Sequence, residues 1–167
     1  LLLLNAGTCE YVDAYNLDLA AFERTFAINF HAVVAATKYF MPLLKASLTP
    51  QLAIVSSMAH FFPFTRSQAC GASKAAVSYF TDSLRVDLAG SGISVHLIEP
   101  GFVDTPLTQK NDFSMPFLMQ PEEAAGHMLR LMKSNRFKAS FPSLFSWLFR
   151  GGNFLPDWLY YRIFAPK

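Results

Sequence analysis

The sequence predicts an α/β fold built on a parallel β-sheet. Two observations support this. Short apolar runs alternate along the chain with long segments whose apolar residues recur every three or four positions. The first two short runs, at 1–4 and 52–55, are also continuously apolar, as expected of strands that helices cover on both faces of a parallel sheet. The chain has 167 residues, 52% of them hydrophobic, which is enough for one domain with a sizeable core.

The first half of the chain contains two predicted strands and one long helix. Four leucines at 1–4 predict a buried strand that ends at Asn5-Ala6-Gly7, although four leucines alone could equally be helical. Asp18 is suited to cap a helix over 19–47, which Pro42 should end or kink. The run at 51–55 then predicts a fully buried strand. The apolar face of the long helix is predicted to comprise Phe22, Phe26, Phe30, Val33, Val34, Thr37, Phe40 and Leu44.

The second half continues the alternation. A helix is predicted over 69–89, with Gly90 and Gly92 as its stop signal, followed by a strand over 93–98. Pro121 begins a helix that runs to about residue 133, and 136–141 is a candidate last strand. The helix over 69–89 is expected to present a broad face of Ala72, Ala76, Tyr79, Phe80, Leu84 and Leu88.

Composition narrows the class of protein. A net charge of +2 argues against nucleic acid as a partner. Cys9 and Cys70 lie far apart with no second pair, which predicts neither a disulfide framework nor a metal site. No apolar run approaches the roughly 18 residues of a membrane span, and the first leucines lack the basic flank of a signal peptide. We therefore expect a cytoplasmic domain in a reducing compartment.

The last part of the chain differs from the rest in being basic and rich in aromatic residues. Residues 130–167 carry seven lysines and arginines against one aspartate. Apolar and aromatic residues after 140 predict two short amphipathic helices, broken by Gly151-Gly152-Asn153 and by Pro156. Such a segment suits peripheral contact with an anionic membrane, or docking over the substrate pocket or a neighbouring subunit.

Several motifs occur in a fixed order and at fixed spacing. They are Asn5-Ala6-Gly7 after the first strand, Asn29 in the first long helix, Ser57 after the second strand, Gly71-Ala72-Ser73-Lys74 in the next helix, and Pro100-Gly101-Phe102-Val103-Asp104-Thr105 after the third strand. Ser57 precedes Cys70 by thirteen residues, and Lys74 follows Cys70 by four. In this order and spacing, the chain from about residue 1 to 125 resembles the short-chain dehydrogenase/reductase superfamily.

The resemblance implies a Rossmann-like, doubly wound parallel sheet and an oxidoreductase that interconverts a carbonyl and a secondary alcohol with NAD or NADP. It assigns catalytic roles to Asn29, Ser57, Lys74 and the residue at 70, where the family has a tyrosine as proton donor. It assigns cofactor contacts to Asn5, Ala6, Gly7, Lys74, Pro100, Gly101, Val103 and Thr105. It also implies a homodimer or homotetramer, with the aromatic stripe of the first long helix in the core or at the subunit interface.

Two departures from the family pattern bear on activity. The glycine-rich first half, which holds the pyrophosphate and selects NAD or NADP, is not found in these residues, so the chain is expected to represent the C-terminal part of the fold. The tyrosine position is Cys70, whose thiol Lys74 would acidify but whose reach is about 3–4 Å shorter than that of a phenol. The alternatives are therefore an impaired enzyme, a catalytically silent dehydrogenase-like binding protein, or a peripheral membrane module.

The predicted domain organisation follows from these motifs. Residues 1–140 form the partial dehydrogenase domain, with a substrate loop at 106–119, and residues 141–167 form an extension. Phe113, Met115 and Phe117 in the loop, together with Ser57, are expected to contact a lipophilic substrate. A buried, satisfied amide or a helix kink is the structural alternative for Asn29. No role is expected for His60 or His96.

Overall fold

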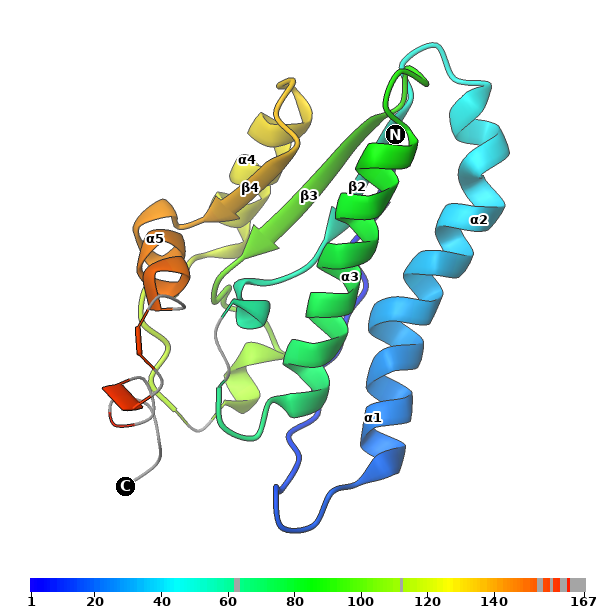
Figure 1. Ribbon diagram of the computed structural model, residues 1–167. Coiled ribbons are helices and arrows are strands. Elements are labelled where there is room, and N and C mark those ends of the chain that lie inside the picture. Colours follow the sequence, from blue (N-terminus) through cyan, green and yellow to red (C-terminus); the bar gives the residue numbers. More distant parts are fainter. Residues whose placement is uncertain (62–63, 112, 153–154, 157, 160–161, 163–167) are drawn as a thin grey trace.

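The computed structural model describes residues 1–167 except 62–63, 112, 153–154, 157, 160–161 and 163–167. Four parallel strands form one sheet in the order β1-β2-β3-β4, with helices between successive strands (Figure 1). The strands are β1 (Leu2–Leu4), β2 (Gln51–Val55), β3 (Ser94–Pro100) and β4 (Lys138–Phe141). The predicted parallel α/β sheet is confirmed.

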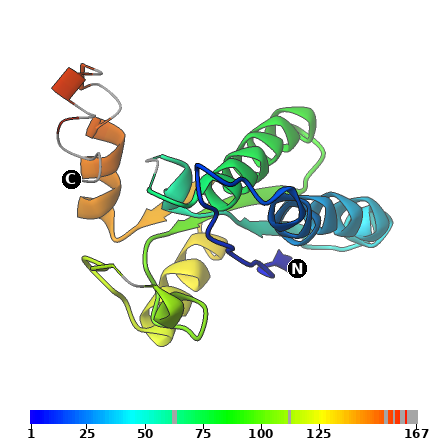
Figure 2. The same ribbon diagram turned by 90° about the horizontal axis from the view of Figure 1, so that it is seen from below.

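The helices cover both faces of this sheet (Figure 2). They are α1 (Leu19–Phe26), the π-helical turn η1 (Ala27–His31), α2 (Ala32–Lys45), the short η2 (Met58–His60), α3 (Gln68–Asp87), the short η3 (Thr108–Lys110), α4 (Pro121–Met132) and α5 (Ser143–Gly152). Side chains of a strand alternate between faces. Leu52 and Ile54 of β2 therefore pack with α2 and α3, whereas Ala53 and Val55 pack with α4.

The long predicted helix is continuous and contains one π-helical turn. Asp18 caps α1 by accepting a hydrogen bond from the Ala21 backbone N–H at 3.2 Å, as predicted. The chain then passes through the π-helical turn η1, which includes Asn29, and continues as α2 past Pro42 to Lys45. Pro42 therefore does not end the helix, and the irregular turn occurs at Asn29 instead.

Helix α3 buries part of the predicted face, because Phe80, Leu84 and Leu88 pack against the core, but it also buries polar residues that were not predicted. Tyr79 is 79% exposed, and the buried positions include the polar residues Ser73, Ser78 and Thr81. Each hydroxyl has a partner: Ser73 Oγ and Thr81 Oγ1 donate to carbonyls one turn earlier in the helix, whereas Ser78 Oγ donates to Ser56 Oγ after β2. Small hydroxyl residues whose hydrogen bonds are satisfied can face a sheet closely, so apolar periodicity alone missed this part of the buried face. Gly90 and Gly92 follow α3 with φ of +80° and +82°, which fits their predicted role as stop residues.

The extension after β4 begins within the packed domain. Phe141 is buried in the core against Ala124 and Leu131 of α4, so the predicted boundary after residue 140 cuts through β4. Helix α5 follows and includes Gly151 and Gly152, which were expected to break it. Residues 157, 160–161 and 163 of the second predicted tail helix lie outside the described residues. Trp147 and Leu148 of α5 are 77% and 59% exposed, and no described helix is long and apolar enough to cross a membrane.

A buried carboxylate joins this extension to the sheet. Glu99 of β3 is fully buried, and its carboxylate accepts a hydrogen bond from Ser140 Oγ at 2.6 Å and pairs with His60 Nε2 at 2.9 Å. Arg150 of α5 lies 3.3 Å from it and Lys138 of β4 3.7 Å. Burial alone raises the pKa of Glu99, but hydrogen bonds from His60 and Ser140 and the charge of Lys138 hold that pKa below its ordinary value. His60, for which no role was predicted, is therefore a structural partner.

His96, the other histidine without a predicted role, is also anchored. It is 2% exposed in β3, and its Nδ1 lies 2.9 Å from the backbone carbonyl of Arg136, just before β4. This contact adds a side-chain link between β3 and the chain entering β4. Both histidines therefore support the fold near β3 and β4.

We expect Glu99→Gln to lower the free energy of unfolding by about 1–3 kcal/mol at pH 7, because charge-assisted hydrogen bonds are lost. A carboxyl with a lowered folded-state pKa contributes stability above its ordinary pKa of 4.5, and this contribution is lost as the pH falls through the folded-state pKa. The difference from wild type should therefore shrink in acid. Urea denaturation from pH 3 to 7 measures this, with the exposed Glu23→Gln as control. A constant difference across that range would contradict the assignment.

Candidate active site

The residues that follow β1, β2 and β3 meet at one edge of the sheet, as the carboxyl ends of parallel strands do. They surround a cavity of about 620 Å³. Ten of the predicted site residues line it: Asn5, Gly7, Ser57, Cys70, Lys74, Pro100, Gly101, Val103, Thr105 and Phe113. Four others do not line it: Ala6, Asn29, Met115 and Phe117.

Two consecutive serines at the end of β2 have different partners. Ser56 is buried; its hydroxyl donates to the Lys74 carbonyl at 2.8 Å and accepts from Ser78 Oγ at 2.7 Å, which attaches the strand end to α3. Ser57 lines the cavity, and its Oγ accepts from the Ala59 backbone N–H at 3.1 Å. Ser56 therefore fixes the position from which Ser57 presents a hydroxyl to the cavity.

Lys74 brings a cation to the floor of the cavity. Its ammonium donates to the backbone carbonyl of Val55 at 3.1 Å. A Cβ at Gly7 would stand 3.2 Å from Lys74 Nζ, so the absence of a side chain there leaves room for the ammonium. Burial lowers the pKa of Lys74 to about 8 from its ordinary 10.5. Lys74 is therefore a covered cation in the cavity wall and not a solvated helix lysine.

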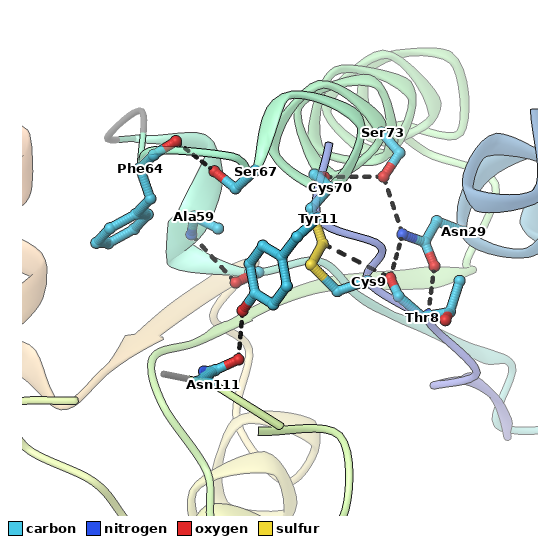
Figure 3. Close-up of a disulfide and its surroundings, with 11 residues drawn as sticks. Thr8, Cys9, Tyr11, Asn29, Ala59, Phe64, Ser67, Cys70, Ser73 and Asn111 are labelled. Carbon is cyan, nitrogen blue, oxygen red and sulfur yellow. Dashed lines mark hydrogen bonds between the residues drawn. A yellow bond between two sulfur atoms is a disulfide. The ribbon is translucent and has the colours of Figure 1, made fainter. Parts of the chain in front are cut away.

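Asn29 lies behind the cavity wall, completely buried (Figure 3). Its amide oxygen accepts from the Thr8 backbone N–H at 2.8 Å, and its amide nitrogen donates to the Thr8 carbonyl and to Ser73 Oγ, each at 2.9 Å. Both donor hydrogens of the amide are used. The side chain thus ties the loop after β1 to α3, which fits the structural alternative of a buried, satisfied amide, and it lies in a π-helical turn.

The expectation that Cys70 carries a free thiol is wrong. Cys9, in the loop after β1, and Cys70, in the first turn of α3, form a disulfide with a Cα–Cα separation of 5.2 Å (Figure 3). Cys70 therefore has no thiol to donate a proton or to be acidified by Lys74 in this state. The argument for a reducing compartment rested on unpaired cysteines and loses that support.

The segment predicted as a substrate loop forms one side of the cavity. A bridge between Val103 and Met119 closes its base, with Asp104 N–H donating to the Met119 carbonyl at 2.8 Å. Between them, Phe113 lies on the cavity while Met115 Sδ accepts from the Asn111 side chain at 3.1 Å. The loop is thus held at both its base and its tip.

Aromatic side chains that sequence reasoning missed complete this wall. Phe64 and Phe102 line the cavity, with ring centroids 6.5 Å and 6.0 Å from that of Phe113. Tyr11 also lines it; its ring meets Phe113 edge-on, and its hydroxyl donates to the Asn111 side chain. These residues sit in loops without regular periodicity, but Phe102 follows the Pro-Gly turn directly and Tyr11 follows the Asn-Ala-Gly turn by four residues. Proximity to those turns was the available signal.

Comparison with known proteins identifies the family of this chain. The family model described as short chain dehydrogenase matches residues 1–114. The chain belongs to the short-chain dehydrogenase family.

Individual relatives agree with this. The chain is 35% identical over 142 residues to an uncharacterized oxidoreductase of Myxococcus xanthus, covering 85% of this chain and 56% of that protein. It is 37% identical over 109 residues to human 17-beta-hydroxysteroid dehydrogenase type 2, covering 65% and 28% respectively. It is 31% identical over 137 residues to an NADPH-dependent 1-acyldihydroxyacetone phosphate reductase of Schizosaccharomyces pombe, covering 81% and 46%. The chain thus spans about half, or less, of the length of these relatives.

Solved structures share the fold. A short chain dehydrogenase from Burkholderia cenocepacia, in complex with NADP, superposes with a TM-score of 0.83 at 21% identity, over 97% of this chain and 67% of its own. A short-chain dehydrogenase from Sphingobium yanoikuyae, in complex with NADPH, gives 0.76 at 22% identity, over 85% and 57%. The Rossmann-like class predicted from the sequence is confirmed.

The lowered pKa of Lys74 makes stability depend on pH. Between about pH 8 and 10.5 the unfolded chain holds the Lys74 proton while the folded chain releases it, so wild-type stability should rise with pH in this window, by at most about 3 kcal/mol. Lys74→Met lacks this rise, and its stability relative to wild type should therefore fall between pH 8 and 10. Urea denaturation measures the difference, with exposed Lys45→Met expected to follow wild type. Parallel curves for Lys74→Met and wild type would show that the ammonium is solvated.

Proposed function

We propose that this chain forms the substrate-binding and catalytic part of an NAD(P)-dependent oxidoreductase that interconverts a carbonyl and a secondary alcohol. One observation carries the proposal: Ser57 and Lys74 line the same cavity, at the strand edge where α/β folds bind ligands. Membership of the short-chain dehydrogenase family and relatives named as dehydrogenases and reductases support it.

The cavity residues fit a nicotinamide cofactor on one side. Asn5, Gly7 and Lys74 come from the ends of β1 and from α3, and Gly7 leaves open the space beside the Lys74 ammonium. Pro100, Gly101, Val103 and Thr105 line the wall after β3. When bound, the cofactor would supply or accept the hydride. Lys74 would donate a hydrogen bond to its ribose, an interaction that suits a cation at this position.

The other side fits a lipophilic substrate. Phe64, Phe102 and Phe113 offer apolar and aromatic surface, while Ser57 offers one hydroxyl at the cavity wall. A few convergent polar groups in an apolar pocket are typical of small-molecule sites. Ser57 Oγ–H would donate to the carbonyl oxygen of the substrate and orient it. Relatives named for steroid and acyldihydroxyacetone phosphate substrates agree with an apolar substrate class.

The disulfide favours a second candidate function, a dehydrogenase-like binding protein without turnover. The position of the family's proton donor holds Cys70, and its sulfur is bonded to Cys9. A general acid must carry a proton within hydrogen-bond reach of the reacting oxygen. In the disulfide state, residue 70 cannot do this, so binding would be retained while proton transfer would need another donor.

A tyrosine at residue 70 distinguishes the two functions. In a protein that carries the family's nucleotide-binding half ahead of Leu1, we expect Cys9→Ala/Cys70→Tyr to reduce an apolar ketone about 10²–10⁴-fold faster than Cys9→Ala/Cys70→Ala, the usual contribution of a positioned general acid. NADPH and NADH oxidation, followed by absorbance, measures the rate. Equal rates would show that residue 70 does not face the reacting oxygen, and would count against the assignment of Ser57 and Lys74 as well.

We also propose that the complete protein is a homodimer or homotetramer through the outer faces of α2 and α3. Tyr39, Leu43, Tyr79 and Val86 are each between 66% and 79% exposed on these helices. Large apolar side chains gathered on one face mark an interaction surface. In light scattering after size exclusion, Leu43→Glu/Tyr79→Glu should shift the complete protein toward monomer. The solvent-side double change Glu122→Gln/Glu123→Gln on α4 should leave the mass unchanged, and an unchanged mass for both variants would exclude this face.

A further inference from the structure

The disulfide lies in the wall of the cavity and not in the packed interior. Both Cys9 and Cys70 line the cavity. Cys9 is half-buried in the loop after β1, whereas Cys70 is 8% exposed at the start of α3. Cys9 is thus the more exposed of the two residues, and we expect a small solute that enters the cavity to reach Cys9 more readily than Cys70.

Hydrogen bonds to Asn29 hold the chain just before Cys9, in addition to the disulfide. Thr8, next to Cys9, is bound through its backbone N–H and carbonyl to the Asn29 amide. The same amide bonds Ser73 Oγ, which donates in turn to the Cys70 carbonyl at 2.8 Å. A continuous hydrogen-bonded path thus joins the backbone beside Cys9 to the backbone of Cys70.

The chain just after Cys9 is also held by contacts other than the disulfide. The Val12 backbone N–H donates to the Arg66 carbonyl at 2.9 Å, shortly before α3 begins. Val12 also packs with Ala21 and Ala69 in a small buried cluster. Contacts other than the disulfide therefore hold the backbone on both sides of the bridge.

We propose that Cys9 and Cys70 form a reversible thiol-exchange site, which takes a small thiol of the glutathione class through the cavity. Opening the bridge requires no separation of elements, because the hydrogen bonds and the buried cluster persist. The reduced Cys70 S–H has an acceptor in place, the Thr8 carbonyl 3.7 Å from its Sγ. The inference concerns the bridge alone and does not depend on the proposed oxidoreductase activity.

The exchange proceeds in two steps, with the small thiol as reductant. Its thiolate attacks Cys9 Sγ, the sulfur–sulfur bond breaks, and Cys70 leaves as a thiolate while Cys9 carries the mixed disulfide. A second thiolate attacks the small-molecule sulfur of that mixed disulfide and releases Cys9 as a thiolate. The two protons given up by the two small thiols end on Cys9 and Cys70. Two electrons reduce the bridge, and the two small thiols become one symmetrical disulfide.

The test uses the whole 167-residue chain in mixtures of reduced and oxidised glutathione, without denaturant. Acid quenching, alkylation and intact-mass spectrometry count the bridged, mixed and free cysteines, while near-UV circular dichroism follows the fold. We expect the bridge to open and close reversibly with the dichroism retained. In Cys70→Ser, the remaining Cys9 should form the mixed disulfide with oxidised glutathione about tenfold faster than Cys70 does in Cys9→Ser, because exposure governs thiol reactivity.

A second variant tests the hydrogen-bonded path with little disturbance of packing. Ser73→Ala removes the link between the Asn29 amide and the Cys70 carbonyl. The glutathione ratio at which half of the chains are bridged should shift about three- to tenfold toward the open form, the effect expected from one hydrogen bond that preorganises the pair. Ser91→Ala, a change in the exposed turn after α3, should leave that ratio unchanged.

Several outcomes would overturn the proposal. One is a bridge that opens only in urea, which would make it a buried structural crosslink. Loss of near-UV dichroism on reduction would show that the surrounding contacts do not hold the cysteines together. Two free thiols in excess oxidised glutathione would show that the pair does not bond in solution. Equal rates for the two single-cysteine variants would exclude entry from the Cys9 side.

Discussion

The site depends on one buried amide. Asn29 binds the backbone of Thr8 on one side and Ser73 on the other, so it fixes the loop after β1 against helix α3. Gly7, Cys9 and Tyr11 reach the cavity from that loop, and Cys70 and Lys74 reach it from that helix. An amide with all its donors satisfied in a dry interior is costly to displace. The π-helical turn around Asn29 therefore belongs to the site although Asn29 does not line the cavity.

The sequence predicted the strands and the common edge of the site well, because both depend on local patterns. Short runs between the predicted helices identified all four strands to within two residues, and turns rich in small or polar residues marked the carboxyl ends of the first three. Long-range partners were not predictable in this way. Part of the buried face of α3 consists of hydroxyls that bond within the helix or to Ser56 after β2, and the role of His60 is set by Glu99, 39 residues further along the chain. No periodicity encodes such pairings.

The spacing of motifs identified the position of Cys70 in the site but could not show that its sulfur is bonded. The thirteen-residue offset from Ser57 places Cys70 in the first turn of α3, on the cavity. Whether that sulfur is a free thiol depends on Cys9, which reaches it only because the loop after β1 folds back over α3 and is held there by Asn29. Two cysteines without a second pair do not predict a disulfide framework, but a single bridge needs only adjacent backbones, and these are 5.2 Å apart at Cα.

Glu99 and Lys74 are both buried near the carboxyl ends of the strands, but neighbouring groups offset the cost of burial for Glu99 only. This difference bears on function. Glu99 is surrounded by His60, Ser140, Lys138 and Arg150, which outweigh the cost of its burial and keep it ionised. The Lys74 ammonium donates to the backbone carbonyl of Val55, and the cost of its burial is not offset, so its pKa falls to about 8. The cost of burying the Lys74 charge is not offset by other protein groups. A ligand that brings hydrogen-bond acceptors or negative charge would therefore stabilise this cation strongly. Glu99 therefore serves the fold, whereas Lys74 imposes a stability cost that a bound ligand would relieve.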